Sequence, residues 1–450
     1  MTLSHLNRRD LLKLGAAGAL APWASLEAVA QTTPLEDYRA LVCVFMFGGN
    51  DGNNLIVPTD TTRYGQYQRA RPNLALPREQ LLPITPLNGG GATYGLHPAM
   101  GGVQALFNSG SAAVLANVGP LMVPTRRAQY LARSVPLPVN LFSHSDQQGA
   151  WQSAINDGPA RHGWGGRLLE RLVPPESVNR GYSAVSLAGG NVWELGDAGL
   201  TAYRVAPSGE FGFDFYDPQN LADPMSVAIS GLLGEATTDP FAQTWLSTLT
   251  RSIDNQRVLT AALSGSALAT VFPDTGLGVQ LRMAARLIGA RQALGLKRQC
   301  FFCSIGGFDT HGEDQLGIQN AAFAEIADAV AAFHAATVEL NLTREVTLFT
   351  ASDFGRNLPS NGQGTDHGWG SHHLVVGGSV QGGHLVGQFP ELVVTGPDDA
   401  GQGVWIPTTA VDQVGTELGR WFGADDARLD AIFPRRGEFD ASIGLMRSVA

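Results

Sequence analysis

Three apolar segments of the sequence are each followed by small or turn residues and then by an aspartate. These pairs of segment and aspartate are 40–47 with Asp51, 300–305 with Asp309, and 346–350 with Asp353. Ligands in an open parallel sheet bind beyond the carboxyl ends of the strands, so neighbouring strands of this kind would bring the three carboxylates together. Such carboxylates repel one another, and a bound cation offsets that repulsion. The pattern therefore predicts a divalent metal site.

Histidines extend the set of possible metal ligands. His311 stands shortly after Asp309, and His367 is followed by His372 and His373. A mixed Asp/His site suits zinc or manganese, and it suits magnesium or calcium where oxygen ligands dominate. Each aspartate alone is equally well explained as a helix cap or a turn residue. The joint pattern of aspartates and histidines favours a metal.

A serine at the start of a predicted helix is a candidate nucleophile. Ser143 opens a helical stretch, where its hydroxyl faces the positive end of the helix dipole and an anion can also bind. The spacing from Ser143 to Asp146 fits a capping box equally well, and a cap needs no chemistry. Ser145 and Thr125 are alternative nucleophiles. Arg356 is a candidate for stabilising charge on an ester oxygen, with a structural arginine as the alternative.

Five short apolar runs, bounded by glycine or turn residues, predict the strands that position these side chains. They cover residues 40–47, 112–118, 300–305, 346–350 and 374–377. Helical patterns cover residues 97–107, 279–294 and 321–339. Continuous apolar runs are typical of parallel strands covered on both faces. We therefore predict an α/β fold with a mostly parallel central sheet and helices on both faces, and an insertion or cap around residues 182–274.

The composition excludes several classes of function. The chain of 450 residues has a formal net charge of −10, and its mature part has no basic block, which argues against a nucleic-acid partner. With 44% hydrophobic and 16% charged residues it can bury a large core. No further apolar stretch approaches the roughly 20 residues that a membrane-spanning helix needs, so no permanent membrane span is predicted.

Residues 1–30 predict export. Paired arginines, an apolar run and a small-x-small cleavage site follow one another at Arg8 and Arg9, residues 14–21, and residues 28–30. This order is typical of the twin-arginine route, which carries chains that have already folded, often with a metal or cofactor bound. We expect the twin-arginine export machinery as a partner and a periplasmic or secreted product. The mature chain, residues 31–450, is predicted to form a single domain.

Five motifs together resemble a known family. They are FGGNDGNN at 47–54, Ser143 and His144 with Asp146 and Gln148, GGFDTH at 306–311, SDFGR at 352–356, and GTDHG at 364–368. As a set running in order between residues 41 and 383, they resemble the exported bacterial proteins grouped as domain of unknown function 1501. That family is similar to the alkaline phosphatase and sulfatase superfamily. The resemblance implies a three-layer sandwich, a site with one or two metals, and a Ser, Thr or modified Cys as nucleophile.

The resemblance also implies a set of ligands. The implied metal ligands are Asp51, Asp309, His311, Asp353 and His367. The sequence departs from the superfamily pattern because one residue, and not three, separates Asp309 from His311, and because Phe354 follows Asp353 where the superfamily has a histidine. One metal is then lost, or it is rebuilt with His372 or His373.

The implied activity is hydrolysis of a phosphate or sulfate ester. A divalent metal would polarise the ester oxygens and lower the pKa of Ser143 or of a bound water. Arg356 would stabilise the developing charge. The alternative is a non-catalytic, metal-containing binding or assembly protein that keeps the fold without the chemistry, since fold alone does not fix function.

Overall fold

The computed structural model describes residues 37–209, 216–217, 219–312 and 314–447. The predicted export signal and its cleavage site therefore lie outside the described residues. The central sheet contains β1 (Arg39–Met46), β5 (Ala112–Gly119), β6 (Ala184–Ser186), β7 (Tyr203–Arg204), β8 (Arg298–Ile305), β9 (Val346–Ser352), β10 (Ser371–Val376), β11 (Leu385–Val386) and β12 (Thr409–Ala410). Their order is β11-β5-β10-β9-β1-β8-β6-β7, and β12 also pairs with β5.

Most of this sheet is parallel, as predicted. β1 pairs in parallel with β8 and β9, and β6 pairs in parallel with β7 and β8. β10 is antiparallel to both of its neighbours, β5 and β9. The prediction of a parallel strand at 374–377 is therefore wrong. No helix lies between β9 and β10, and a strand that returns without a crossover helix enters the sheet in the opposite direction.

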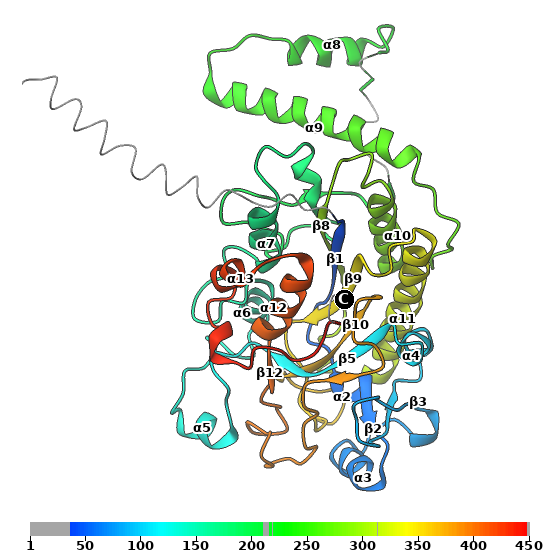
Figure 1. Ribbon diagram of the computed structural model, residues 1–450, viewed down its shortest axis with the longest axis vertical. Coiled ribbons are helices and arrows are strands. Elements are labelled where there is room, and N and C mark those ends of the chain that lie inside the picture. The colour runs from blue at the N-terminus through cyan, green and yellow to red at the C-terminus, as the bar shows by residue number, and fades with distance from the viewer. Residues whose placement is uncertain (1–36, 210–215, 218, 313, 448–450) are drawn as a thin grey trace, which may run out of the picture. The chain divides into compact units, whose positions relative to one another are not determined.

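Helices cover both faces of the sheet (Figure 1). One layer contains α4 (Gly101–Asn108), α10 (Gly276–Gly289) and α11 (Gln315–Glu339). In this layer α11 contacts both α4 and α10. The other contains α6 (His144–Ser153), α7 (Trp164–Leu172), α12 (Val411–Phe422) and α13 (Asp426–Ile432). Strands β1 and β9 are apolar and buried along almost their whole length because both faces are covered. The predicted α/β fold class is confirmed.

The remaining elements lie outside these three layers. β2 (Ile56–Pro58), β4 (Tyr94–Leu96) and β3 (Leu82–Ile84) form a small antiparallel sheet, which accompanies α2 (Gly52–Leu55) and α3 (Thr61–Ala70). Helix α5 covers Arg127–Ala132. Short 3-10 helices occur at Arg78–Gln80, Arg180–Ser183 and Arg436–Glu438.

The segment predicted as an insertion, residues 182–274, has two parts. Its beginning supplies β6 and β7 to the central sheet, and its later part forms α8 (Pro224–Leu233) and α9 (Pro240–Ser264), which contact each other. Helix α11 is long and apolar enough to cross a membrane by composition, but half of its apolar window is buried, and it packs between α4 and α10. Its apolar character is accounted for by that packing.

Candidate metal centre

The register of the sheet brings the ends of three strands together. Met46 at the end of β1 pairs with Ile305 of β8 and with Ser352 of β9. The loops that leave β8 and β9 carry Asp309 and Asp353, and one histidine side chain contacts both carboxylates. The structure therefore brings these two predicted site residues to the same edge of the sheet, beyond the carboxyl ends of parallel strands.

Glycine allows the loops to approach closely. Gly48 has a φ of +112°, and a Cβ at this position would lie 2.4 Å from the backbone nitrogen of Asp309. Its backbone N–H donates to Asp353 Oδ1 at 3.2 Å. Only a residue without a side chain fits both the positive φ and the contact, so the turn after β1 depends on glycine.

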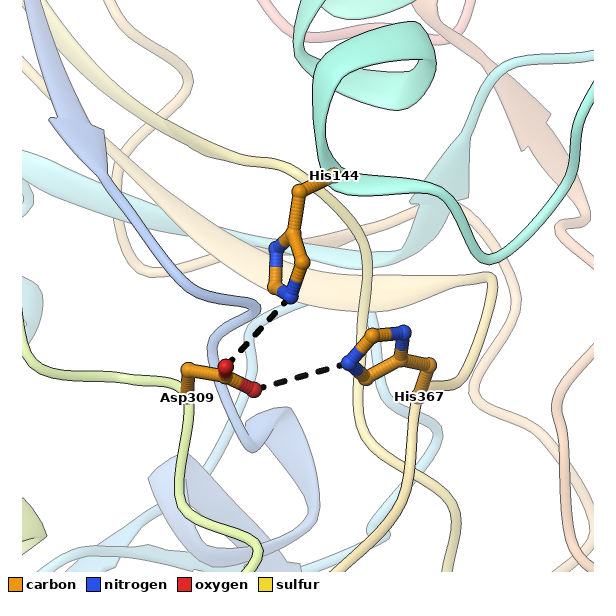
Figure 2. Close-up of side chains that lie close together, drawn as sticks. All are labelled: His144, Asp309 and His367. Carbon is orange, nitrogen blue, oxygen red and sulfur yellow. Dashed lines mark ion pairs between the residues drawn. The ribbon is translucent and has the colours of Figure 1, made fainter.

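Two histidines and one aspartate form the candidate centre, which we call the His/Asp centre (His144, Asp309 and His367; Figure 2). One possible ligand atom from each residue lies within 4.8 Å of the others. The Nε2 atoms of His144 and His367 each lie 3.5 Å from an oxygen of Asp309. The Asp309 side chain is 48% exposed, so the centre is open to solvent and to a small ligand.

The far ring nitrogens of both histidines are held by oxygen atoms. His367 Nδ1 lies 2.7 Å from the carbonyl oxygen of Phe142, which can only accept, so Nδ1 carries the proton. His144 Nδ1 lies 2.7 Å from Asp353 Oδ2. In the neutral ring this leaves the lone pair on Nε2, which faces Asp309. Metal-binding histidines in proteins are oriented in this way by carboxylate or carbonyl oxygens.

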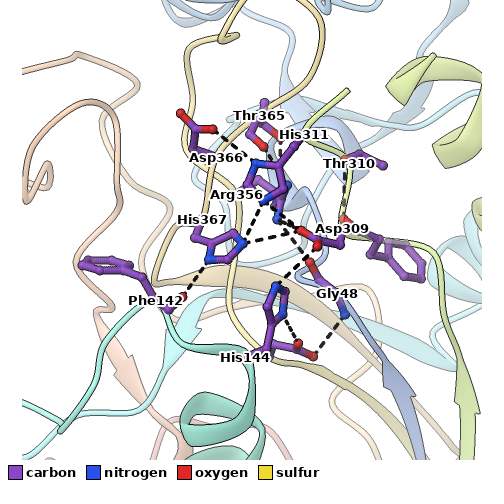
Figure 3. Close-up of polar contacts among 12 residues, drawn as sticks. Gly48, Phe142, His144, Asp309, Thr310, His311, Arg356, Thr365, Asp366 and His367 are labelled. Carbon is purple, nitrogen blue, oxygen red and sulfur yellow. Dashed lines mark hydrogen bonds and ion pairs between the residues drawn. The ribbon is translucent and has the colours of Figure 1, made fainter. Parts of the chain in front are cut away.

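A third histidine reaches the same carboxylate (Figure 3). His311 Nε2 lies 3.0 Å from Asp309 Oδ1 and 2.9 Å from His367 Nε2, and His311 Nδ1 lies 3.3 Å from Asp366 Oδ1. At this distance one neutral ring donates its N–H to the other, or a cation lies between them. His311 therefore adds a third imidazole beside the centre.

The charge state of the centre follows from its neighbours. Burial raises the pKa of Asp309, but the hydrogen bond and charge of Arg356, with smaller contributions from His311 and His144, outweigh it and hold the pKa below its usual value. Burial lowers the pKa of His367. The bond to the Phe142 carbonyl opposes this shift, and the charge of Arg356 adds to it. An ionised carboxylate and a neutral imidazole are the forms that bind a metal.

Arg356 is a buried support for this carboxylate. Its side chain is fully buried, and Nη1 donates to Asp309 Oδ1 at 3.0 Å and to the Gly48 carbonyl oxygen at 3.2 Å. Nη2 donates to the carbonyl oxygen of Thr365 at 2.6 Å, and Nε donates to the hydroxyl of the same residue at 3.3 Å. These bonds favour the structural reading of Arg356 over direct contact with an ester oxygen.

Asp353 is likewise buried behind the centre. Its side chain has no exposed surface, and Oδ2 accepts from Gln148 Nε2 at 2.9 Å in addition to its contact with His144. Oδ1 accepts from the Gly48 backbone. The predicted ligand Asp353 thus lies next to the centre but contacts a ligand histidine, which is the geometry of a positioning residue.

The structure places Asp51 in a different network. Asp51 begins α2 as its N-cap and is buried, with Oδ1 accepting from the backbone and side chain of Asn53. Oδ2 forms a buried ion pair with Arg71 and accepts from Gln315 Nε2 at 2.6 Å. Among the described residues Asp51 does not join the candidate metal group, and its oxygens are occupied by these donors.

The other predicted residues also have defined partners. Ser143 is the N-cap residue of α6, but its hydroxyl donates to Asp146 Oδ2 at 2.6 Å and makes no capping bond to the helix backbone. Thr125 donates to the Val123 carbonyl oxygen at 2.9 Å. Among the described residues, the Ser143 hydroxyl contacts Asp146 and Ser145 and no residue of the His/Asp centre.

His372 and His373, expected as replacement ligands, lie buried in β10. His372 Nδ1 accepts from the Asn117 backbone at 3.0 Å, and the His373 ring packs edge-on against Trp151. Burial lowers the pKa of both histidines to about 3. These two rings are therefore neutral core residues, and neither joins the candidate metal group.

His144 is the candidate ligand that sequence reasoning missed. It stands beside Ser143 in a quoted motif, but the hydroxyl drew attention because helix N-termini bind anions. The available signal was a histidine at the first position of a helix that faces the strand ends. Three-dimensional placement was needed to prefer the ring over the hydroxyl.

Comparison with known proteins gives a family and distant structural neighbours. Comparison with curated proteins gives no match. Among solved structures, the PsFucS1 sulfatase from Pseudoalteromonas sp. aligns with a TM-score of 0.35 and 13% identity, covering 95% of this chain and 76% of that chain. A structure described as BT1596, a 2-O GAG sulfatase, aligns with a TM-score of 0.30 and 12% identity, covering 89% and 75%. A putative sulfatase from Bacteroides thetaiotaomicron VPI-5482 gives 0.29 and 10%, covering 89% and 75%.

A family profile matches the C-terminal part of the chain, at residues 246–430. The match contains Asp309, His311, Asp353 and His367, whereas His144 lies before it. Over residues 246–430 the chain is similar to the family described as "Protein of unknown function (DUF1501)".

Proposed function

We propose that this chain is an exported, metal-dependent hydrolase of phosphate or sulfate esters. One observation carries the proposal: three imidazole rings direct Nε2 towards the oxygens of Asp309, while each Nδ1 is engaged by another oxygen atom. The three rings thus converge on one carboxylate, which Arg356 holds from its buried side. A divalent cation is the partner that such a set fits.

Zinc is the metal that we expect. Catalytic zinc sites use three protein ligands from histidine and carboxylate and leave a position open for water. With bonds of about 2.0 Å, ligand atoms in a tetrahedral zinc site lie about 3.3 Å apart. The 3.5 Å separations between Asp309 and the rings of His144 and His367 are close to this value. Asp51 and Asp353 are engaged by other donors, which weakens the case for an oxygen-rich magnesium or calcium site.

The residues around the centre then have separate tasks. A bound metal supplies a Lewis acid for the ester oxygens and lowers the pKa of a bound water. Arg356 keeps Asp309 ionised and in place, and Asp353 fixes the ring of His144. Because the hydroxyl of Ser143 is held by Asp146, we place the attack on water.

Metal analysis combined with ester hydrolysis tests the proposal. We expect close to one zinc per chain and turnover of 4-nitrophenyl phosphate or 4-nitrophenyl sulfate that chelation removes and zinc restores. His144→Ala should lose both zinc and turnover. His334→Ala is the matched control, since His334 lies on α11 and outside the centre. Purified protein without any divalent metal would overturn the proposal. Full zinc loading without turnover of either ester would favour the non-catalytic metal protein.

Ser143→Ala decides the nucleophile. Attack by water predicts that the variant keeps its zinc and its turnover, with a small change in stability from the lost bond to Asp146. Loss of turnover with full zinc content would instead make Ser143 the nucleophile. Ser252→Ala serves as the control, because Ser252 is exposed on α9, where its hydroxyl donates to the Thr248 carbonyl oxygen.

A further inference from the structure

A cavity of about 590 Å³ opens directly beside the His/Asp centre. It lies between Phe47 at the end of β1, the first turns of α6, and two loops at residues 158–160 and 190–192. Gln148 connects the cavity with the His/Asp centre. It lines the cavity and donates to Asp353, which contacts His144. Neither this cavity nor a larger one of about 1220 Å³ beside α5 is lined by a residue of the His/Asp centre itself, but Ser145 in the smaller cavity directly follows His144.

The lining of the smaller cavity is mixed, with polar and apolar side chains, and carries no positive charge. Among its described lining residues there is no lysine, arginine or histidine, and the single charged side chain is Asp146. The Ser143 hydroxyl donates to Asp146 Oδ2 at 2.6 Å and the Asn140 amide donates to Oδ1 at 3.2 Å, so this carboxylate is held in place as an acceptor. The other polar groups are uncharged side chains such as Gln148 and Gln152. A second anionic group on a ligand would meet repulsion here and no counter-ion.

One buried amide is fixed with its donors towards this cavity. Gln152 is 5% exposed, and its Oε1 accepts from the backbone nitrogens of Val192 at 2.8 Å and Trp193 at 3.1 Å. These two bonds decide the orientation of the amide, because a nitrogen in that position could not accept them. Both of these bonds use Oε1, which leaves the NH2 group as a donor, and the residue lines the cavity. A ligand with acceptor oxygens would satisfy it.

We propose that this cavity binds the alcohol part of the ester and that this alcohol is uncharged and rich in hydroxyl groups, as a neutral sugar is. The inference rests on the proposed hydrolase function and names the substrate class of the same centre. Hydroxyls can donate to Asp146 and accept from Gln152, whereas the ester group lies at the metal. Phe47 supplies an apolar wall, as is common in small-molecule sites.

Direct binding of sugars that carry no ester tests this inference separately from catalysis. Saturation-transfer NMR on the purified protein compares uncharged methyl hexosides with the corresponding methyl uronosides, which add one carboxylate. We expect transfer to at least one uncharged hexoside and none to its acidic counterpart. Equal transfer to the acidic sugars, or no transfer to any hexoside, overturns the inference even if the protein hydrolyses aryl esters.

Two variants assign the binding to the cavity. A Cβ at Gly158 would meet nothing within 4 Å, so Gly158→Leu fills the cavity without a clash and should abolish the transfer. Gly101→Leu is the matched control, because that glycine has equal room at the start of α4, outside the cavity. Gln152→Glu keeps the acceptor for Val192 and removes the NH2 donors, so transfer should also fall. Unchanged transfer in both cavity variants overturns the assignment. Sugar binding without metal or turnover would leave the cavity as a binding site and refute the hydrolase.

Discussion

Removing the carboxylate of Asp353 should weaken zinc binding although Asp353 does not face the metal position. The carboxylate is fully buried and accepts from His144 Nδ1, Gln148 Nε2 and the Gly48 backbone nitrogen. Asp353→Ala leaves all three donors without this acceptor. The ring of His144 is then free to rotate or to move its proton to Nε2, and a protonated Nε2 cannot bind a metal.

The size of the effect follows from the number of bonds. Loss of a partner that orients a metal-binding histidine costs about 10- to 100-fold in metal affinity, which is about 1.4 to 2.7 kcal/mol. Each buried donor left unpaired costs about 1 to 3 kcal/mol, so the metal-free variant should also unfold more easily. Asp353→Asn is the milder change. The asparagine oxygen can still accept from His144 and Gln148. Its NH2 group then faces the Gly48 N–H, so only that one hydrogen bond is lost. We expect a loss of less than about tenfold for this variant.

Competition with a zinc chelator measures these affinities on folded protein. Asp223→Ala is the control, because Asp223 caps α8 outside the centre. The control should lower stability by about 1 kcal/mol and leave the zinc affinity unchanged. If Asp353→Ala binds zinc as tightly as the wild type, the orienting role is refuted. If alanine and asparagine weaken binding equally, the acceptor oxygen is not what positions His144.

Three further predictions concern other parts of the chain. Asp51→Ala should cost about 3 to 5 kcal/mol of stability, because it leaves the Arg71 cation buried and unpaired. Zinc content per folded chain should stay the same. Loss of zinc at full stability would make Asp51 a ligand. Burial raises the pKa of Glu194 to about 8 from 4.5, so its contribution to stability is present below about pH 4.5 and is lost as the pH rises through about 8. At about 1.4 kcal/mol per pKa unit the loss is roughly 5 kcal/mol, and thermal unfolding of Glu194→Gln at pH 9 should lie above that of the wild type and match it near pH 4. Lysine at both Arg8 and Arg9 should leave the uncleaved chain in the cytoplasm, as fractionation would detect, and normal export of this variant would contradict the twin-arginine prediction.

The sheet was predictable because strands that are buried on both faces consist largely of apolar residues. Most residues of strands β1, β8 and β9 are buried and apolar, and a run of this kind has few alternatives to a covered strand when glycine and turn residues bound it. The direction of β10 was not predictable in this way. Its residues are buried like those of a parallel strand, and direction depends on the connection, where a loop takes the place of a helix.

The candidate site was predictable only as a region. A carboxylate after a strand can join a candidate metal group, as Asp309 does, support a histidine, as Asp353 does, or pair with an arginine, as Asp51 does with Arg71. These three outcomes have the same local pattern of small residues and aspartate. They differ in which side chain, distant in the sequence, contacts the carboxylate in the folded chain. The spacing of residues along the chain does not determine this contact.

The way the centre is assembled also links metal binding to folding. His144 comes from the start of α6, Asp309 from the loop after β8, and His367 from the loop before β10. A ligand that binds the native chain alone stabilises it, and zinc at one hundred times its dissociation constant would add about 2.7 kcal/mol. A metal at the centre would connect these three segments, which no disulfide connects, since the cysteines are free and buried. A chain exported after folding would carry with it a metal that it bound in the cytoplasm. Measured in cell fractions, zinc should therefore be bound already in the uncleaved precursor, and a precursor that gains zinc only after cleavage would break the link between folding, metal and route.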